Sequence, residues 1–264
     1  SANADVDEDE PEIYMETLIH AREASAMMAT MRCMEYLLSR YGVDPVITDL
    51  LDNREIWYVP VMNVDGYEYN RQIAPNGGGS WRKNRRLVTG TTYGIDLNRN
   101  FGFQWGYDNS GSSPTPSSGT YRGASAFSEP EAANVRDFIT SRLGRGITTA
   151  WDIHNSGGLC MWPWGYANLN SPRHAGYAEM ATDLVAQNGY RPGIVNTTLY
   201  PINGGGVDWF EGTAGLHGWL PELGEAFWVA NDRILALAEE NLHMLLTAVK
   251  YAGPYLITQQ LSLV

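Results

Sequence analysis

Strand-like and helix-like segments alternate along this chain, and that alternation limits the folds it can adopt. Short apolar, β-branched runs predict strands, whereas longer runs with apolar residues at about every third or fourth position predict helices. Such alternation is typical of a sheet covered by helices on both faces, so the sequence predicts an α/β fold with a mixed central sheet. The expected strands are residues 13–19, 55–62, 147–153, 159–162, 194–199 and 217–223, and the expected helices are residues 23–40, 128–142, 174–188 and 231–249.

The length and composition of the chain favour one folded domain. Its 264 residues include 44% hydrophobic side chains, which are enough for a large core, and no linker-like stretch divides them. Residues 1–10 are acidic and poor in apolar side chains, so we expect a disordered segment or a processing remnant there. Residues 11–264 then form the single folded domain.

The charge of the chain argues against several kinds of partner. A formal net charge of −12 leaves no basic surface of the kind that binds nucleic acid. No apolar run reaches the roughly 18 residues that a membrane-spanning helix requires, so we expect no membrane partner. The two cysteines, Cys33 and Cys160, fall in separate apolar segments. Buried thiols are the simpler interpretation of both, and a disulfide between them stays open.

A long stretch in the first half of the chain has little regular pattern. Residues 63–127 contain a run of three glycines, a Ser/Thr/Pro-rich run and several arginines. Irregular segments of this length inside a compact domain usually carry function. We therefore expect residues 63–127 to build one wall of a site.

Two histidines and a glutamate have the composition of a catalytic zinc site. His20 and Glu23 are three residues apart where an expected strand passes into an expected helix, a spacing that lets both side chains point to one side. His154 and Glu222 lie at or near the ends of two other expected strands, where open α/β sheets bind their ligands. Catalytic zinc commonly has three protein ligands and an open position for water. Taken alone, each histidine also fits a surface ion pair or a packed core residue.

Five short motifs occur in an order that resembles one enzyme family. They are HARE at 20–23, WRKNR at 81–85, DLNRN at 96–100, DIHNSGG at 152–158 and LYPINGGGVDW at 199–209. Together they resemble the carboxypeptidase A-like family of zinc metallocarboxypeptidases, from about residue 10 to the last expected helix. The resemblance implies a hydrolase with one zinc ion that removes single residues from the C termini of peptides or proteins. It also implies a secreted or extracellular monomer.

The resemblance implies roles for the residues of the reaction centre. His20, Glu23 and His154 match the zinc ligands of the family, and Glu222 matches its general base. Arg82 matches the arginine that polarises the carbonyl group of the bond to be cut. The chemistry agrees, because zinc lowers the pKa of bound water from 15.7 to about 7, where a carboxylate can accept the proton. A fixed guanidinium in a dry cleft stabilises the negative oxygen that develops.

The resemblance also implies a set of substrate-binding residues. Asn98 and Arg99 match the pair that holds the terminal carboxylate, and Tyr200 matches a mobile tyrosine that closes over it. Arg22 matches an outer substrate-binding arginine. A guanidinium fork suits a planar carboxylate, which favours exopeptidase over endopeptidase activity. Asp96 or Asp152 could orient a ligand histidine through its free N–H, with an ordinary structural ion pair as the alternative.

The resemblance implies that the pocket for the leaving residue lies near Val207, where an acidic side chain would favour lysine or arginine. Valine carries no charge, and Ile202, Leu199 and Met161 are expected to face the same pocket. Burial of an unpaired lysine would cost several kcal/mol, so we expect a preference for apolar or aromatic C-terminal residues. We expect Asp208, the next residue, to anchor a turn instead.

Three features depart from the family pattern. Only 19 residues precede His20, a lead shorter than usual for the family, while Ala24 and Ser156 replace aromatic residues that many relatives carry. Two other functions therefore stay open. One is a catalytically weak or inactive protein that binds peptide tails, and the other is an amide hydrolase acting on a non-standard substrate. The complete set of proposed ligands and Glu222 argue against the first.

Overall fold

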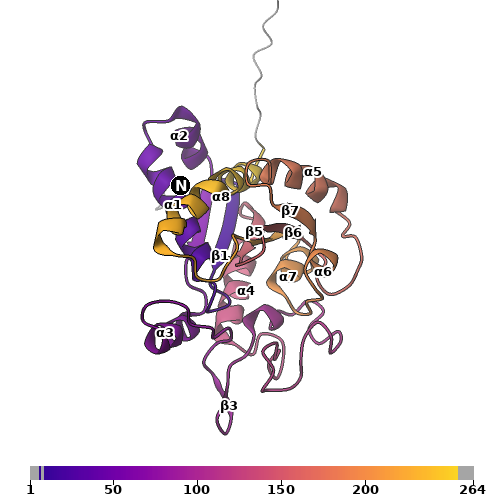
Figure 1. The fold of residues 1–264 in the computed structure, drawn as a ribbon. Helices are drawn as coiled ribbons and strands as arrows, with labels where there is room; N and C mark the ends of the chain where they lie inside the picture. Colours follow the sequence, from indigo (N-terminus) through magenta and orange to yellow (C-terminus); the bar gives the residue numbers. More distant parts are fainter. Residues whose placement is uncertain (1–5, 7–8, 255–264) are drawn as a thin grey trace, which may run out of the picture.

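A six-stranded mixed sheet forms the centre of the computed structural model, which describes Val6 and residues 9–254 (Figure 1). Its strand order is β2-β1-β5-β8-β6-β7, and only the β8–β6 pair is antiparallel. The strands are β1 (Glu12–Thr17), β2 (Glu55–Val59), β5 (Ile147–Ile153), β6 (Leu159–Trp162), β7 (Arg191–Ile194) and β8 (His217–Glu222). The predicted mixed sheet is confirmed. Most of the acidic segment expected at residues 1–10 lies outside the described residues.

Helices cover both faces of the sheet, as predicted (Figure 1). Along β1, Ile13 and Met15 pack into one core while Tyr14 packs into the other, because successive strand residues point to opposite faces. The first core also contains residues of α1 (Ala24–Arg40), α2 (Pro45–Asp52), α5 (His174–Leu184) and α8 (Asn231–Tyr251). The second core contains residues of α4 (Pro130–Arg142) and α7 (Gly206–Gly212).

Local sequence explains where several helices begin. Pro130 occupies the first turn of α4, where its missing N–H costs nothing. The Asp44 side chain accepts hydrogen bonds from the N–H groups of Val46 and Ile47 and so caps α2, with Pro45 in the first turn. This helix was not among those expected from the sequence.

The segment 63–127 contains more regular structure than predicted. It includes α3 (Val64–Ile73), the hairpin of β3 (Leu87–Thr89) and β4 (Thr92–Tyr93), and a 3₁₀ turn, η1 (Leu97–Arg99). The Asn63 side chain accepts from the N–H of Gly66 and thereby begins α3. Polar residues and Gly66 inside α3 weaken its apolar pattern, so the sequence did not predict this helix.

The strand expected at 194–199 is wrong. The structure has β7 at Arg191–Ile194 followed by one helical turn, α6 (Val195–Thr198). The β7 pairing with β6 stops at Ile194 opposite Trp162, where β6 itself ends. Beyond that point no ladder partner remains, and Leu199 N–H bonds back to the carbonyl of Val195.

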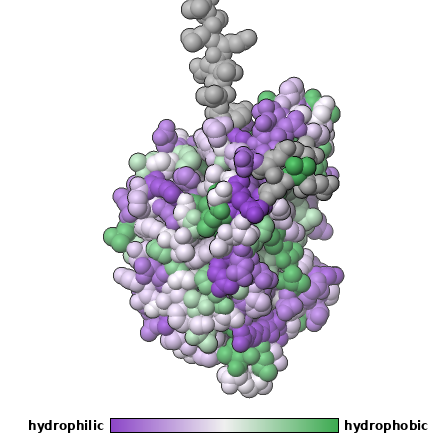
Figure 2. Space-filling model, turned by 180° about the vertical axis from the view of Figure 1, so that it is seen from behind, coloured by the Kyte–Doolittle hydropathy of each residue, from purple (hydrophilic) through white to green (hydrophobic). Residues whose placement is uncertain are grey.

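The interior and the surface agree with the composition. Cys33 and Cys160 are buried free thiols, as the simpler interpretation predicted, and burial raises the pKa of each to about 12. The reverse face of the molecule mixes hydrophilic and hydrophobic residues (Figure 2). Within the described part of the chain, no helix combines the length and apolarity needed to cross a bilayer.

Candidate metal centre and substrate cleft

Three neighbouring parallel strands carry the chemical groups of the site. His20 follows the end of β1, His154 follows β5 directly, and Glu222 is the last residue of β8. Backbone hydrogen bonds hold the segments of His154 and Glu222 side by side. The His154 N–H donates to the carbonyl of Pro221 (2.9 Å), and the Leu223 N–H donates to the carbonyl of His154 (2.8 Å). Residues far apart in sequence thus meet at one edge of the sheet, as predicted.

His20, Glu23 and His154 form a buried triad. The Nδ1 atom of His20 lies 2.8 Å from Glu23 Oε1, and the Nδ1 atom of His154 lies 2.8 Å from Glu23 Oε2. The two Nδ1 atoms are 3.1 Å apart, and one candidate ligand atom from each residue lies within 4.8 Å of the others. All three residues are at most 3% exposed. Two imidazoles and one carboxylate are a donor set that suits catalytic zinc.

Two buried aspartates support the histidines from behind. Asp96 Oδ1 lies 3.2 Å from Nε2 of His20, and Asp152 Oδ1 lies 2.9 Å from Nε2 of His154. At His20, an acceptor at Nε2 favours the tautomer that leaves the Nδ1 lone pair toward Glu23. At His154, the Asn98 Nδ2 atom also lies 3.0 Å from Nε2. Burial opposes a charge on His154, but Asp152 and Glu23 outweigh it and raise its pKa well above the usual value. The centre therefore favours positive charge, as a cation site should.

Glu222 stands beside this triad with one oxygen unused. Its side chain is buried, and its Oε2 atom has no hydrogen-bond partner among the described residues. Burial, followed by the charge of Glu23, raises the pKa of Glu222 to about 8. A carboxyl group with such a pKa can exchange a proton near neutral pH.

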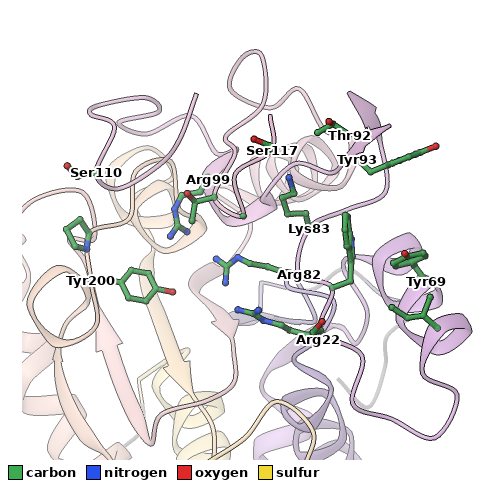
Figure 3. Close-up of a pocket in the computed structure, with 16 residues that line it drawn as sticks. Arg22, Tyr69, Arg82, Lys83, Thr92, Tyr93, Arg99, Ser110, Ser117 and Tyr200 are labelled. Atoms are coloured by element: carbon green, nitrogen blue, oxygen red, sulfur yellow. The ribbon is translucent and has the colours of Figure 1, made fainter. Parts of the chain in front are cut away.

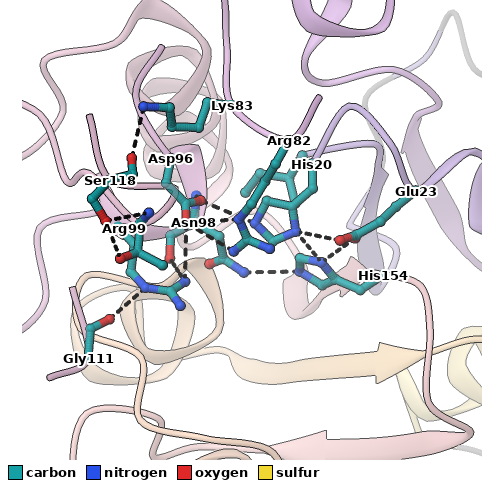
Figure 4. A network of polar contacts seen from close by, with 12 residues as sticks. His20, Glu23, Arg82, Lys83, Asp96, Asn98, Arg99, Gly111, Ser118 and His154 are labelled. Atoms are coloured by element: carbon teal, nitrogen blue, oxygen red, sulfur yellow. Dashed lines mark hydrogen bonds and ion pairs between the residues drawn. The ribbon is translucent and has the colours of Figure 1, made fainter. Parts of the chain in front are cut away.

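A cluster of polar contacts joins the triad to two arginines (Figure 4). Asp96 is completely buried, and its Oδ2 accepts from Arg82 Nε (3.1 Å) and Nη2 (2.9 Å). Arg99 Nη1 lies 3.8 Å from the same oxygen. Burial alone would raise the pKa of Asp96, but Arg82 and Arg99 hold it well below its usual range. One carboxylate therefore orients a candidate ligand histidine and both arginines.

Arg99 is held in place by backbone carbonyls. Its Nε donates to Gly111 O (2.6 Å) and its Nη1 donates to Asn98 O (2.8 Å), while only 1% of the residue is exposed. Gly204 packs against it with φ +65, and a Cβ there would lie 2.7 Å from the Arg99 carbonyl oxygen. This contact explains a glycine in the motif at 199–209. The ring of Tyr200, 43% exposed, has its centroid 5.9 Å from Arg99 Cζ.

A cleft of about 840 Å³ opens in front of these groups (Figure 3). Arg82, Arg99 and Tyr200 line it, and so does Arg22, whose guanidinium stacks over the ring of Phe227 at 4.3 Å. Burial, with the charge of Arg82, lowers the pKa of Arg22. In Figure 3 the side chains of Arg22, Arg82 and Tyr200 converge on one space.

Comparison with known proteins agrees with this geometry. A family model described as "Zinc carboxypeptidase" matches residues 1–244. The chain belongs to the zinc carboxypeptidase family. The predicted resemblance and the predicted fold are thereby confirmed.

Relatives of this zinc carboxypeptidase chain include curated and solved proteins. It is 34% identical to "Metallocarboxypeptidase A" of Arthroderma otae over 88% of the chain and 57% of the relative. It is 30% identical to human "Carboxypeptidase B" over 95% of the chain and 60% of the relative. The crystal structure of thrombin activatable fibrinolysis inhibitor superposes with a TM-score of 0.84 at 26% identity, covering 92% of this chain and 62% of that one. The chain thus spans about three fifths of the length of these relatives.

An apolar cluster of this zinc carboxypeptidase domain includes Ile202 and, packed against it, Leu199, which flank the cleft-lining Tyr200 and Pro201 in sequence. Val207 is completely buried there and belongs to one packed group with Met161, Leu220 and Ile202. Leu199 packs against the cluster, so the residues predicted for the pocket do come together. Leu220 was not foreseen, although it lies on β8 only two residues before Glu222.

Asp208 anchors a turn, as predicted from the sequence. Its Oδ1 accepts from the N–H of Gly165 (2.8 Å) and its Oδ2 accepts from the N–H of Tyr166 (3.0 Å). Burial raises the pKa of Asp208 to about 7, even though these N–H donors favour the charged form. The carboxyl group is therefore occupied by the backbone and is no free charge for a substrate lysine.

Proposed function

We propose that this chain is a zinc-dependent metallocarboxypeptidase that hydrolyses the C-terminal peptide bond of peptides or proteins. The proposal rests on one observation: a single residue, Asp96, lies against both the candidate metal site and the arginines that would bind the substrate. Asp96 contacts both His20 of the triad and Arg82, and Arg99 lies within 3.8 Å of it. A pure peptide binder would have no use for the triad, and a general amide hydrolase would have no use for the buried Arg99.

His20, Glu23 and His154 would hold one zinc ion, which supplies Lewis acidity and lowers the pKa of a water molecule to about 7. Glu222, whose Oε2 has no hydrogen-bond partner among the described residues, would take up a proton from the attacking water and deliver it to the amine that leaves when the peptide C–N bond breaks. Arg82, at the cleft wall, stabilises the negative oxygen that develops from the substrate carbonyl.

Arg99 binds the terminal carboxylate of the substrate, with the Asn98 amide beside it. The Asn98 Oδ1 atom accepts from the N–H of Gly206, which fixes the orientation of the amide. Tyr200 is the exposed group at the mouth and closes over the terminal residue. Arg22 contacts the peptide farther from its end. These contacts restrict hydrolysis to chain ends.

The apolar cluster around Val207 receives the leaving side chain, so we propose a preference for apolar or aromatic C-terminal residues. Every member of that cluster is uncharged, and Asp208 is occupied by backbone N–H groups. A lysine there would be buried without a partner, at a cost of several kcal/mol. The secreted location and the monomeric state remain predictions of the resemblance.

Blocked dipeptides ending in Phe, Leu or Lys test the function directly. We expect the zinc-loaded chain to release Phe or Leu, to lose activity with a chelator and to regain it with zinc. An amidated C terminus should be a poor substrate, because Arg99 then has no carboxylate to bind. Equal hydrolysis of the amide and the free acid would contradict the role of Arg99, and faster release of Lys would contradict the pocket. Binding without hydrolysis would favour a peptide-tail binder.

A further inference from the structure

One backbone carbonyl holds the guanidinium of Arg99 at its Nε edge. The Nε atom donates to Gly111 O at 2.6 Å (Figure 4). Gly111 belongs to a bend of residues 108–111 that lies outside every described helix and strand. A guanidinium is planar and rigid, so an acceptor at one edge sets the direction of its other N–H groups. The position of the 108–111 bend therefore determines how Arg99 faces the cleft.

The side chain of Asp108 holds this bend together. Its Oδ1 accepts from the N–H groups of Ser110 (2.9 Å) and Gly111 (2.8 Å). The Gly111 N–H and then the Asn203 amide lower the pKa of Asp108, so its carboxylate is ionised at neutral pH. An ionised oxygen is a stronger hydrogen-bond acceptor than a neutral one. Asp108 thus fixes Gly111 through its N–H group, while the carbonyl of Gly111 meets Arg99.

Asn203, from the motif at 199–209, fastens the same bend. Its Nδ2 donates to Asp108 Oδ1 (2.6 Å) and to Asp108 O (3.0 Å), and its backbone N–H donates to Gly111 O (3.2 Å). Asn203 is completely buried, and a Cβ at position 111 would overlap its side chain. The Gly111 carbonyl therefore accepts from both Arg99 and Asn203. Two loops far apart in sequence meet at this one oxygen.

Asp108 itself lies outside the lining of the cleft, whereas Ser110 and Arg99 belong to it (Figure 3). A further contact comes from Arg122, whose Nη1 donates to Asp108 O (3.0 Å) and to Ser112 Oγ (3.0 Å). The bend is thus held through both its backbone and its acidic side chain. The geometry gives Asp108 contact with the support of Arg99 and none with a peptide in the cleft.

We propose that Asp108, together with Asn203, is a positioning residue for the recognition of the substrate carboxylate, because it fixes the bend whose Gly111 carbonyl holds Arg99. The inference rests on the proposed function, since it requires a terminal carboxylate at Arg99. A guanidinium fork binds a planar carboxylate through two parallel hydrogen bonds, and a small displacement of the fork weakens both. Loss of Asp108 should therefore weaken the recognition of free C termini and leave the metal centre unchanged.

A pair of blocked dipeptides tests this role. Both end in Phe, one as the free acid and one as the C-terminal amide, and kcat and KM are measured for each. We expect Asp108→Ala to raise KM for the acid by about tenfold with little change in kcat, as for a contact made equally with substrate and transition state. The amide brings no carboxylate to Arg99, so its slow hydrolysis should stay the same. The acid-to-amide ratio of kcat/KM should therefore fall by about tenfold.

Asp108→Asn is the conservative variant. Its amide oxygen can accept from the same N–H groups, so it should restore most of the acid-to-amide ratio. The matched control is Asp44→Ala. Asp44 also accepts from two backbone N–H groups, those of Val46 (2.9 Å) and Ile47 (3.3 Å), but it caps α2 outside the cleft lining. This variant should lose stability in urea unfolding and keep the ratio of the parent. A ratio that falls equally in Asp44→Ala would reveal a general effect of lost stability and overturn the positioning role.

An acid-to-amide ratio that stays at the parent value in Asp108→Ala would also refute the inference. Failure of the proposed function is a separate result, in which the zinc-loaded parent hydrolyses neither dipeptide. Binding of N-acetyl-phenylalanine and of its amide to the parent and the variants is then measured by calorimetry. Tighter binding of the acid by the parent, with that preference reduced in Asp108→Ala and restored in Asp108→Asn, would support the positioning role. An equal preference in parent and Asp108→Ala, or none in the parent, would contradict it.

Discussion

Asp96→Asn would remove the one carboxylate on which the parts of the site converge. Asp96 is completely buried. Its Oδ2 accepts two bonds from Arg82, and its Oδ1 lies 3.2 Å both from His20 Nε2 and from the backbone nitrogen of Asn98. Asparagine has nearly the same shape, but its amide nitrogen cannot accept a hydrogen bond. Whichever oxygen it replaces, an N–H group then faces another donor.

The expected loss of stability follows from the charges left behind. Removal of one partner from a buried ion pair costs about 3–5 kcal/mol, since the other charge remains without compensation. Arg82 keeps 13% of its side chain exposed to the cleft, whereas Arg99 keeps 2%. Water can relieve part of the first charge and little of the second. We therefore expect Asp96→Asn to lower the free energy of unfolding by about 3 kcal/mol, the lower end of that range.

Urea unfolding in the presence of a chelator measures this loss without a contribution from metal binding. The matched control is Asp137→Asn. Asp137 pairs with Arg136 at 2.8 Å, but the two side chains are 66% and 38% exposed. The control should cost less than about 1 kcal/mol. If both variants lose equal amounts, the buried contacts of Asp96 do not stabilise the fold. Zinc titration is a second, independent measurement. We expect the zinc affinity to fall by about 10–100-fold in Asp96→Asn and to stay unchanged in Asp137→Asn, because only the first substitution removes the acceptor that orients His20.

Three further outcomes follow from the site. Glu222→Gln should lower kcat for a blocked dipeptide by at least about a hundredfold, while calorimetry shows nearly unchanged peptide affinity; retained turnover would exclude Glu222 as the base. Saturating zinc should raise the melting temperature of the chain and a chelator should reverse it, and a melting temperature that ignores zinc would argue against the triad as a metal site. Asp208→Asn should change the pH dependence of unfolding. The pKa of Asp208 in the folded chain, about 7, lies above its value in the unfolded chain. Its contribution to the free energy of unfolding is therefore fully present below about pH 4 and is lost as the pH rises through 7. Stability of the variant relative to the parent should therefore improve over that range, and parallel pH profiles would refute the shift.

The sequence predicted the central strands well because their physical signal is local. The segments at 147–153 and 159–162 agree with β5 and β6 residue for residue. Both strands are almost entirely buried, and β6 is a continuous apolar run, which is the pattern of a strand covered on both faces, whereas β5 mixes apolar residues with Thr148, Thr149 and Asp152. The candidate ligand set depended on the five motifs, because the spacing of His20 and Glu23 alone is a weak signal; the structure does bring these two residues and His154 together.

The errors arose where tertiary contacts override local preference. Ile194, Val195 and Thr197 favour a strand by propensity, but the ladder with β6 stops at Ile194. Helix α7 begins at Gly206 inside a run of three glycines, a poor helix-forming sequence. It forms because the buried Trp209 and Phe210 enter the second core. No local pattern reports such contacts.

The group of aromatic rings around Arg85 could not be predicted from sequence at all. Its three rings come from Tyr69 of α3, from Trp81 in a loop and from Tyr93 of β4, and each alone is typical of an ordinary packing residue. The convergence of Asp96 with a histidine 76 residues away is similar, and the sequence offered it only as one of two alternatives. In both cases the loops of the segment 63–127 bring the groups together.

The proposed catalytic arrangement depends on the register of the sheet more than on those loops. Glu222 lies beside His154 because two backbone hydrogen bonds, on either side of the bridge, fix the end of β8 against the end of β5. Since successive strand residues face opposite sides, a shift of one residue would turn Glu222 away from the cleft. The segment 63–127 instead supplies Arg82, Arg99 and most of the other residues that line the cleft. Changes in the loops should therefore alter which peptides bind, while the proton-transfer geometry stays with the strands.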